Sequence, residues 1–315
     1  MKRKGNIYNN LYDLDNILNV YKIIKKNTKN KDKIIIFEQY FSINIYRIYK
    51  VLKDKTYEVG KYNKFIIYEP KERLILSQNL FDKIINHLVA YELINILDKS
   101  LINSSVATRK NKGTSYAVKL LKKYINELDD FYYLKIDIKK YFYNIDHDIL
   151  KQLLLKKIKD KDFINIVFKI IDSTNSVIEY DNNKGLPIGS LTSQILGIYY
   201  LNEIDHFIKE DLKIKYYIRY LDDFLIIHED KEYLKYCLDE IRKLLNKYKL
   251  VDNNKTCILS KKQGICFLGY RFSDKQRILS KNKRRINKKL KLLKKYDIDK
   301  YNIVLASYKG YFNLK

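Results

Sequence analysis

Cysteine, proline and long apolar runs are all scarce in this 315-residue sequence. The three cysteines (Cys237, Cys257 and Cys266) form no CxxC pair, which excludes zinc-finger spacing and is typical of a reducing compartment. No uncharged run approaches the ~20 residues that cross a bilayer. Met1-Lys2-Arg3-Lys4-Gly5 leads into no apolar stretch of signal-peptide length. We therefore expect a cytoplasmic protein with no membrane partner.

Positive charge, by contrast, is abundant. The chain has 63 Lys and Arg residues against 37 Asp and Glu, which gives a net charge of +26. A charge of this size indicates a polyanionic partner, and nucleic acid is the favoured one. Only ten of the basic residues are Arg, so A+T-rich coding is an alternative explanation. With 46% hydrophobic and 14% aromatic residues, the chain is not expected to be disordered.

Apolar periodicity predicts both helices and strands. The expected helices lie in 10–55, 79–97, 116–128, 147–172, 192–209, 231–248 and from about 280 onward. The expected strands are 65–68, 131–138, 216–220, 224–227 and 265–272. Their order predicts an α+β sheet with helices packed on one face.

Three carboxylates lie at the ends of predicted apolar strands. Asp222 and Asp223 lie at the tip of a predicted hairpin, and Asp137 is near the end of another apolar run. Adjacent acids in such a place repel each other and call for a compensating cation, although two Asp residues filling a β-turn is the simpler alternative. If the two strands are neighbours, the three carboxylates meet at one sheet edge. Oxygen ligands of this kind suit two Mg²⁺ ions, with Mn²⁺ as an alternative.

Several motifs in the correct order resemble those of reverse transcriptases. Tyr220-Leu221-Asp222-Asp223 is similar to the Tyr-x-Asp-Asp box, and Lys135–Phe142 is similar to the first carboxylate motif. The other matching segments are Glu69–Arg73, Asn254-Lys255-Thr256 and Phe267-Leu268-Gly269-Tyr270. The resemblance implies RNA-directed DNA synthesis from dNTPs by two-metal nucleotidyl transfer.

The same resemblance implies a role for each motif residue. Asp137, Asp222 and Asp223 would be the catalytic metal ligands, with the main-chain carbonyl of Ile138 as a further ligand. The remaining roles are triphosphate binding by Lys71 and Arg73, exclusion of a ribose 2′-hydroxyl by Phe142, pyrophosphate protonation by Lys255 and primer holding by Leu268, Gly269 and Tyr270. Cationic side chains suit the triphosphate because they neutralise the transferring phosphoryl groups.

A finer resemblance is to the reverse transcriptases of diversity-generating retroelements, which are related to group II intron, retron and defence-associated enzymes. Most reverse transcriptases carry Gln and Pro where this chain has Ile188 and Gln194, on either side of Gly189 and Ser190. The resemblance implies a bacterial or phage-encoded enzyme that makes errors opposite template adenines. Ile188, Gly189 and Gln194 are accordingly predicted to contact the incoming nucleotide.

Two basic segments are predicted to hold the template–primer duplex. Thr108–Thr114 resembles an Arg-Lys-Gly-Lys-Gly-Thr motif of the same subclass and supplies Arg109 and Lys110. The segment 281–295 interleaves Lys, Arg284 and Arg285 with apolar residues, and as a helix it would turn a cationic face outward. A solvated surface helix is the simpler alternative. Neutralising six phosphates would give a log–log salt dependence of about −4 to −5.

The predicted fold is thus α+β, a right-hand polymerase with an antiparallel-sheet palm, helical fingers and a short helical thumb. The expected regions are an N-terminal helical region (1–60), fingers (61–130), palm (131–272, with a fingers insertion at about 150–185) and thumb (273–315). Predicted partners are an RNA template, a DNA or RNA primer, the cDNA product and dNTPs. A structured RNA or a small accessory protein would assist template holding.

Three alternatives remain open from the sequence. The chain could be an antiphage reverse transcriptase that works with a non-coding RNA, a non-catalytic RNA-binding scaffold, or an RNA-dependent RNA polymerase. Intact acids oppose the scaffold, and Phe142 opposes the RNA polymerase. The four histidines (His87, His147, His206 and His228) belong to no metal-binding or deaminase pattern and are predicted to be structural.

Overall fold

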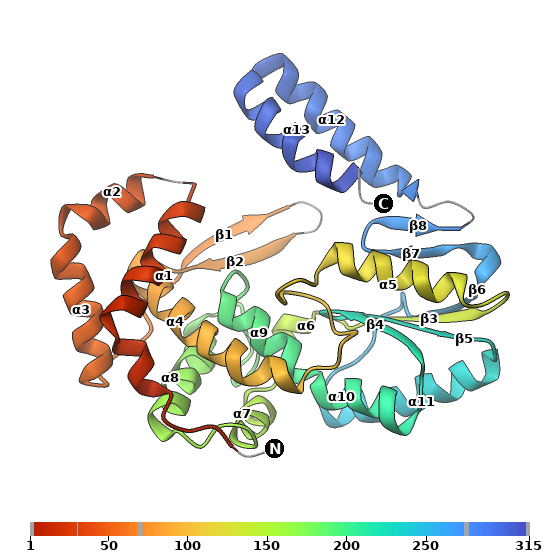
Figure 1. Cartoon of the computed structure of the whole chain (residues 1–315), viewed down its shortest axis with the longest axis horizontal. Helices are drawn as coiled ribbons and strands as arrows, with labels where there is room; N and C mark the ends of the chain where they lie inside the picture. The colour runs from red at the N-terminus through yellow and green to blue at the C-terminus, as the bar shows by residue number, and fades with distance from the viewer. Residues whose placement is uncertain (1–2, 30, 69–71, 274–276, 313–315) are drawn as a thin grey trace. The chain divides into compact units, whose positions relative to one another are not determined.

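The computed structural model describes residues 3–29, 31–68, 72–273 and 277–312, and the chain divides into two compact units (Figure 1). The helical unit comprises Met1–Asn103, Ile138–Phe207 and Arg242–Asp252. The sheet unit comprises Ser104–Asp137, Ile208–Ile241 and Asn253–Lys315. Each unit is therefore assembled from segments that are far apart in the sequence. The four-region division expected from the sequence stays a prediction.

The helical unit is built mainly from amphipathic helices. Its α-helices are α1 (Leu14–Asn27), α2 (Asp32–Gln39), α3 (Phe41–Lys53), α4 (Leu80–Leu97), α6 (Tyr141–Asn144), α7 (His147–Leu155), α8 (Lys161–Asp172), α9 (Leu191–Tyr200) and α10 (Asn202–His206). Short 3₁₀-helices are η1 (Tyr8–Tyr12), η2 (Asp98–Ser100) and η3 (Ser173–Ser176). One antiparallel hairpin, β1 (Asn63–Ile67) and β2 (Arg73–Ser77), completes the unit.

Side-chain caps fix where several of these helices begin. Asn79 accepts from the Asp82 N–H at the start of α4, and Ser190 accepts from the Ser193 N–H at the start of α9. The helical segment predicted over 147–172 is divided into α7 and α8, and between them the Lys159 N–H donates to the Lys4 carbonyl at 2.8 Å. Asp160 then caps α8 by accepting from the Phe163 N–H at 3.1 Å.

The sheet unit contains two antiparallel sheets. The larger has the order β4-β5-β3-β6, from β3 (Tyr132–Asp137), β4 (Tyr216–Tyr220), β5 (Asp223–His228) and β6 (Cys257–Ser260). The smaller has the order β7-β8-β9, from β7 (Ile265–Phe267), β8 (Tyr270–Phe272) and β9 (Arg277–Ile278). The single strand predicted over 265–272 is therefore a hairpin, because Leu268 and Gly269 form a turn with positive φ values of 49° and 90°.

Helix α5 (Thr114–Asn126) packs along one face of the larger sheet (Figure 1). Its buried residues Val118 and Leu121 join one hydrophobic cluster with Leu225 and Ile227 of β5. Because strand side chains alternate between faces, the intervening Ile226 points to the other face and is also buried. Burial on both faces explains why β5 reads as a continuous apolar run.

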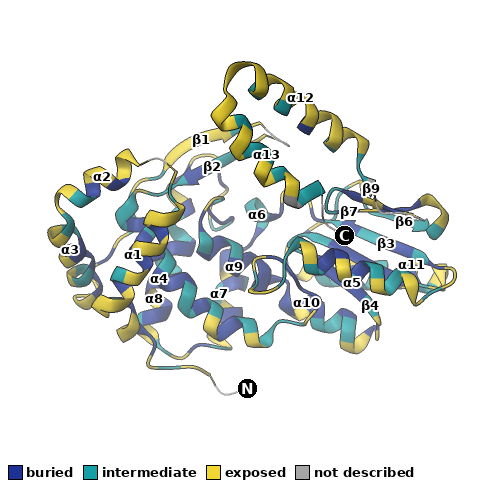
Figure 2. Cartoon of the chain, turned by 45° about the horizontal axis from the view of Figure 1, so that its top comes forward, coloured by how far each residue is buried: buried dark blue, intermediate teal, exposed yellow. Residues whose placement is uncertain are grey.

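Three α-helices, the π-helix η4 (Phe207–Asp211) and the 3₁₀-helix η5 (Lys261–Gln263) complete the described elements. Helix α11 (Lys231–Lys247) runs from the sheet unit into the residue range of the helical unit, and α12 (Ser280–Tyr296) and α13 (Ile298–Phe312) form a helical pair near the C-terminus. Figure 2 shows that α12 is exposed along most of its length, and Ile286 is its buried residue. Among the described residues, none of the helices combines the length and apolar character that crossing a membrane would require.

Candidate active site

The strands that carry Asp137 and Asp223 are direct neighbours. β3 pairs antiparallel with β5, and in this register Asp137 lies opposite Asp223. Directly opposed residues of an antiparallel pair have Cα atoms about 4.5–5.5 Å apart. The condition set by the sequence, that the two acidic strands be neighbours, is therefore met within the sheet unit.

Asp222 lies in the two-residue turn that joins β4 to β5. Tyr220 pairs with Asp223, so Leu221 and Asp222 form the loop of the hairpin. Leu221 occupies the first central position of the turn and has a φ of +54°. Glycine is the usual residue at a turn position with this conformation. The turn therefore projects Asp222 beside Asp223 at the same end of the sheet.

Two lysines approach these carboxylates. The Lys135 ammonium lies 3.4 Å from an Asp223 oxygen, and the Lys255 ammonium lies 3.9 Å from an Asp137 oxygen. The turn that carries Lys255 is attached to the end of β3, because the Asn253 N–H donates to the Asp137 carbonyl at 2.9 Å. The negative charge of the acids is thus balanced locally by ammonium groups.

The three acids fit a divalent ion by donor type and by backbone position. Carboxylate oxygens are the ligands that Mg²⁺ and Mn²⁺ prefer. Among residues 3–29, 31–68, 72–273 and 277–312, however, no three His, Cys, Asp or Glu side chains are already gathered around one point. In this structure Lys135 neutralises Asp223 and Lys255 neutralises Asp137.

Phe142 belongs to the helical unit, on the short helix α6. Its ring packs against α9, where a Cβ added to Gly197 would lie 3.1 Å from the Phe142 Cε1 atom. The neighbouring Tyr141 is buried, and its hydroxyl donates to the Gly197 carbonyl. The half-buried Phe142 ring can pack this closely against α9 because residue 197 has no side chain.

The Ile188–Gly189 segment is attached to the β1–β2 hairpin of the same unit. The Leu76 N–H donates to the Ile188 carbonyl at 2.9 Å, which ties this turn to β2. Gly189 has a φ of +119°, and an added Cβ would lie 3.1 Å from Ile75. Gln194 follows on the first turn of α9 and Arg73 begins β2, whereas Lys71 lies outside the described residues.

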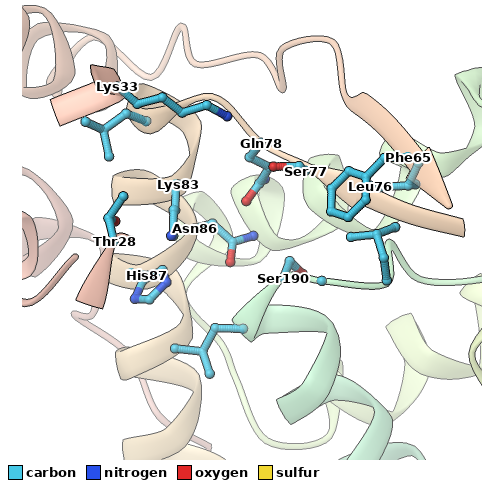
Figure 3. A pocket seen from close by; sticks show the side chains of 14 residues that line it. Thr28, Lys33, Phe65, Leu76, Ser77, Gln78, Lys83, Asn86, His87 and Ser190 are labelled. Atoms are coloured by element: carbon cyan, nitrogen blue, oxygen red, sulfur yellow. The ribbon is translucent and has the colours of Figure 1, made fainter. Parts of the chain in front are cut away.

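A cavity of about 310 Å³ lies beside this segment in the helical unit (Figure 3). Lys33, Lys83, Gln78, His87 and Ser190 are among the residues that line it. Within the described part of the chain, the buried Gln78 Nε2 and His87 Nδ1 atoms have no hydrogen-bond partner. Polar atoms left in this state usually mark a place for water, an ion or a ligand.

The cavity is electropositive. Burial lowers the pKa of His87 to about 4, with a smaller contribution from Lys83, and burial together with Lys33 lowers the pKa of Lys83. Sequence reasoning assigned His87 a structural role and, among the other residues that line the cavity, singled out Gly189 alone as a site residue. Only the fold brings together Lys33 of α2, Gln78 of the β2–α4 connection and His87 of α4, since no local pattern connects these positions.

The predicted primer-holding residues sit at the turn of the β7–β8 hairpin, in the sheet unit. The Gly269 carbonyl accepts from the Leu279 N–H at 3.0 Å and from the Tyr311 hydroxyl at 2.9 Å. The ring of Tyr270 contacts that of Tyr311, with centroids 4.8 Å apart and the ring planes tilted by 37°. The hairpin is therefore fastened to the α12–α13 helical pair.

The predicted duplex-contacting cations also lie in the sheet unit. Arg109 donates to the Ser105 carbonyl at 2.8 Å, and Lys110 is exposed beside it. Arg284 and Arg285 are exposed on α12. Lys110, Arg284 and Arg285 are therefore accessible to solvent, whereas Arg109 is partly buried.

Comparison with known proteins decides the family. Residues 61–272 match the family model described as "Reverse transcriptase (RNA-dependent DNA polymerase)", which covers both the carboxylates and the β7–β8 hairpin. The chain belongs to the reverse transcriptase family. The predicted domain, an RNA-directed nucleotidyltransferase by class, is thereby confirmed. Membership of the family implies a requirement for divalent metal, without specifying the ion.

Curated relatives of this reverse transcriptase domain are intron-encoded proteins. The COX1/OXI3 intron 2 protein of Saccharomyces cerevisiae is 24% identical over 82% of this chain and 38% of its own length. The group II intron-encoded protein LtrA of Lactococcus lactis is 28% identical over 55% of this chain and 29% of its own length. The chain thus spans less than two fifths of the length of these relatives.

Solved structures agree on the fold. Apo telomerase from Candida tropicalis superposes with a TM-score of 0.52 at 18% identity, covering 73% of this chain and 58% of that one. A telomerase complex with an RNA fragment from the same organism gives a TM-score of 0.52 over 69% of this chain and 44% of that one. The predicted polymerase fold, with its mixture of helices and antiparallel sheet, is confirmed.

Proposed function

We propose that this chain is an RNA-directed DNA polymerase that makes cDNA by two-metal nucleotidyl transfer. The observation that carries the proposal is the register of β3 and β5, which sets Asp137 opposite Asp223 and beside the turn that holds Asp222. This arrangement lies inside the segment that matches the reverse transcriptase family. A pair of Asp residues that merely filled a β-turn would need no third acid at the same end of the sheet.

In this proposal Asp137, Asp222, Asp223 and the main-chain carbonyl of Ile138 bind two divalent ions, Mg²⁺ or Mn²⁺. When bound, the ions activate the primer 3′-hydroxyl and stabilise the leaving pyrophosphate. Lys135 and Lys255 balance the carboxylates in the absence of metal. Once displaced from Asp137, the Lys255 ammonium becomes available to donate a proton to pyrophosphate.

The helical unit supplies the proposed nucleotide contacts. Lys71 and Arg73 neutralise the triphosphate, and the ring of Phe142 excludes a ribose 2′-hydroxyl. The fixed position of that ring against Gly197 supports a steric role, since a gate must not yield to the group that it excludes. Gly189 and Gln194 complete the proposed contacts with the incoming nucleotide.

RNA template, primer and cDNA are the proposed macromolecular ligands. The cavity lined by Lys33 and Lys83 supports binding of a template phosphate or base, because it combines cations with buried polar atoms that have no hydrogen-bond partner. Arg109, Lys110, Arg284 and Arg285 are proposed to contact the duplex, and Leu268, Gly269 and Tyr270 to hold the primer. A structured RNA or a small accessory protein would add to template holding.

We further propose error-prone copying of the kind found in diversity-generating retroelements. The Ile188 main chain is fixed on β2, so its side chain has a defined position but offers only apolar contact. Discrimination that depends on a positioned polar group weakens when that group is absent. Ile188→Gln should therefore lower misincorporation opposite template adenine, as measured by sequencing of cDNA. An unchanged error spectrum would remove this role from Ile188.

Nucleic acid that co-purifies with the protein discriminates between two biological roles. Recovery of a template repeat related to a variable gene supports diversification. Recovery of one structured non-coding RNA supports antiphage defence, the alternative that the sequence leaves open. Sequencing of the bound RNA and cDNA distinguishes the two.

The polymerase assignment is tested by extending a DNA primer on an RNA template with dNTPs and Mg²⁺. We expect extension by the wild-type chain and a loss on the order of 10³-fold in Asp222→Asn, which removes one proposed metal ligand. The matched control is Asp239→Asn on α11, which makes the same chemical change away from the sheet edge. Duplex binding without extension would indicate a scaffold, and a preference for rNTPs would indicate an RNA polymerase.

A further inference from the structure

Arg219 is a fully buried arginine close to the catalytic turn of the sheet unit. It lies on β4, two residues before Leu221, and is 0% exposed. Its guanidinium donates to the Leu221 carbonyl at 3.0 Å. Arginine is almost never fully buried unless its charge is matched by partners, so its retention here calls for a reason.

The main chain of Arg219 is fixed as well. β4 is an edge strand of its sheet, and its free edge is covered by the segment Ser104–Val106. The Arg219 N–H donates to the Ser104 carbonyl at 2.9 Å, and the Arg219 carbonyl accepts from the Val106 N–H at 3.0 Å. Residue 219 is therefore held by its backbone on one side and bonds the turn with its side chain.

The turn itself needs such a hold. Leu221 adopts a φ of +54°, which is unfavourable for a residue with a branched side chain and no local polar group. A non-glycine residue persists in this conformation when the surrounding structure over-determines it. The hydrogen bond from Arg219 acts on the carbonyl of the strained residue itself, directly before Asp222.

The segment Ser104–Val106 that covers β4 also anchors the basic loop 108–112. The Gly113 N–H donates to the Val106 carbonyl at 2.8 Å, and Arg109 donates to the Ser105 carbonyl at 2.8 Å. The loop and the acidic turn are thus both fastened around residue 219.

We propose that Arg219 is a positioning residue that fixes the Leu221–Asp222 turn so that Asp222 and Asp223 can bind divalent metal. The inference rests on the proposed function, because it concerns the same carboxylates. A competing explanation is that Arg219 only fills the interior of the sheet unit. The two explanations differ in what a strain-free residue at position 221 would do.

The test combines Arg219→Met with Leu221→Gly. Methionine keeps an unbranched apolar stem in the interior but cannot donate to the Leu221 carbonyl, whereas glycine adopts positive φ without the Cβ penalty. Mn²⁺ affinity is measured by electron paramagnetic resonance of the free ion, and unfolding temperature is measured on the same samples. Arg219→Lys serves as the conservative variant, and Ile218→Met is the control for a core change on the same strand.

We expect Arg219→Met to weaken Mn²⁺ binding roughly tenfold, Arg219→Lys to weaken it less, and Ile218→Met to leave it within about twofold. Leu221→Gly should restore at least half of the loss in the Arg219→Met background, so that the two changes are not additive. Unchanged Mn²⁺ affinity in Arg219→Met, or additive effects in the double variant, would overturn the proposal. If Arg219→Met does not fold alone, Arg219→Lys with and without Leu221→Gly gives the same comparison.

Failure of the proposed function is visible separately. A wild-type chain that binds Mn²⁺ but extends no primer contradicts the polymerase assignment and leaves the Arg219 comparison intact. Conversely, wild-type extension with an Mn²⁺ affinity that is insensitive to residue 219 contradicts only the positioning role.

Discussion

Asp137 and Asp223 are direct cross-strand partners at the end of β3 and the beginning of β5. Opposed like charges in an antiparallel pair are destabilising unless a cation lies between or beside them. Lys135 and Lys255 supply that compensation in the metal-free chain. Under the proposed function, ammonium groups and divalent ions compete for the same carboxylate oxygens at this end of the sheet.

This competition predicts the effect of removing Lys135. Its ammonium lies 3.4 Å from the Asp223 carboxylate and is about one quarter exposed. A pair at about this distance is worth about 1 kcal/mol in a largely aqueous setting. Lys135→Met should therefore lower the Mg²⁺ concentration for half-maximal extension roughly two- to fivefold. Lys235→Met, which removes an ammonium paired with Glu232 on α11, should not change it.

Gly197→Ala tests the placement of the proposed sugar gate. The new methyl group would lie 3.1 Å from the Phe142 Cε1 atom, so the ring must shift by a few tenths of an ångström. We expect the KM for dNTPs to rise roughly fivefold, equivalent to about 1 kcal/mol of binding. The unfolding temperature is measured on the same variant, because the helix preference of alanine and the cost of displacing the ring have opposite effects on stability. An unchanged KM together with unchanged selection against rNTPs would show that Phe142 does not contact the incoming nucleotide.

His87 makes the stability of the chain depend on pH. Burial lowers its pKa from 6.5 to about 4 in the folded state, so the unfolded chain binds more protons between these values. Stability is therefore complete above pH 6.5 and is lost as the pH falls toward 4. Between pH 7 and pH 5 the expected loss is about 1–2 kcal/mol.

Thermal unfolding of His87→Gln at pH 7 and pH 5 measures this contribution. The variant should lose less stability on acidification than the wild type, because glutamine does not titrate. His228→Gln is the control, since the His228 ring accepts a local N–H bond from Asp230 and does not line the cavity. Equal losses in wild type and His87→Gln would show that His87 does not titrate in this range.

The exposed face of α12 predicts a salt-dependent affinity for an RNA–DNA duplex. If the chain neutralises six phosphates, the log–log slope is about −4 to −5. Replacing both Arg284 and Arg285 with Gln should make the slope shallower by about 1.5. The control replaces Lys50 and Lys53 of α3 with Gln, which removes the same charge elsewhere. A wild-type slope near zero would contradict duplex clamping.

The acidic strands can be predicted from the sequence because the residues that identify each strand are close together in the chain. Apolar runs ending in Asp137 and flanking Asp222 identify the strands, and the hairpin fixes which residues form its tip. The register that opposes Asp137 to Asp223 is not local, and only the assumption that the strands pair supplied it. The β7–β8 hairpin was read as one strand because Leu268, an apolar residue, occupies a turn position with positive φ.

Other features could not be predicted from the sequence, because their residues are distant from one another. Helix α8 is separate from α7 because Ile158, which lies between them, pairs with Lys4, a residue more than 150 positions away in the sequence. The cavity near His87 brings together α4, β2 and the connection after α1. The buried guanidinium of Arg219 gives no signal beyond a charged residue in an apolar strand.

Metal-dependent incorporation of a single dNTP on an RNA-templated primer tests the central claim most directly. The rate is compared between the wild type and Asp137→Asn at saturating duplex and Mg²⁺. We predict a loss on the order of 10³-fold, with duplex affinity unchanged within about twofold, because the proposed role of Asp137 is to bind metal and not nucleic acid. Incorporation by Asp137→Asn at the wild-type rate would contradict this role.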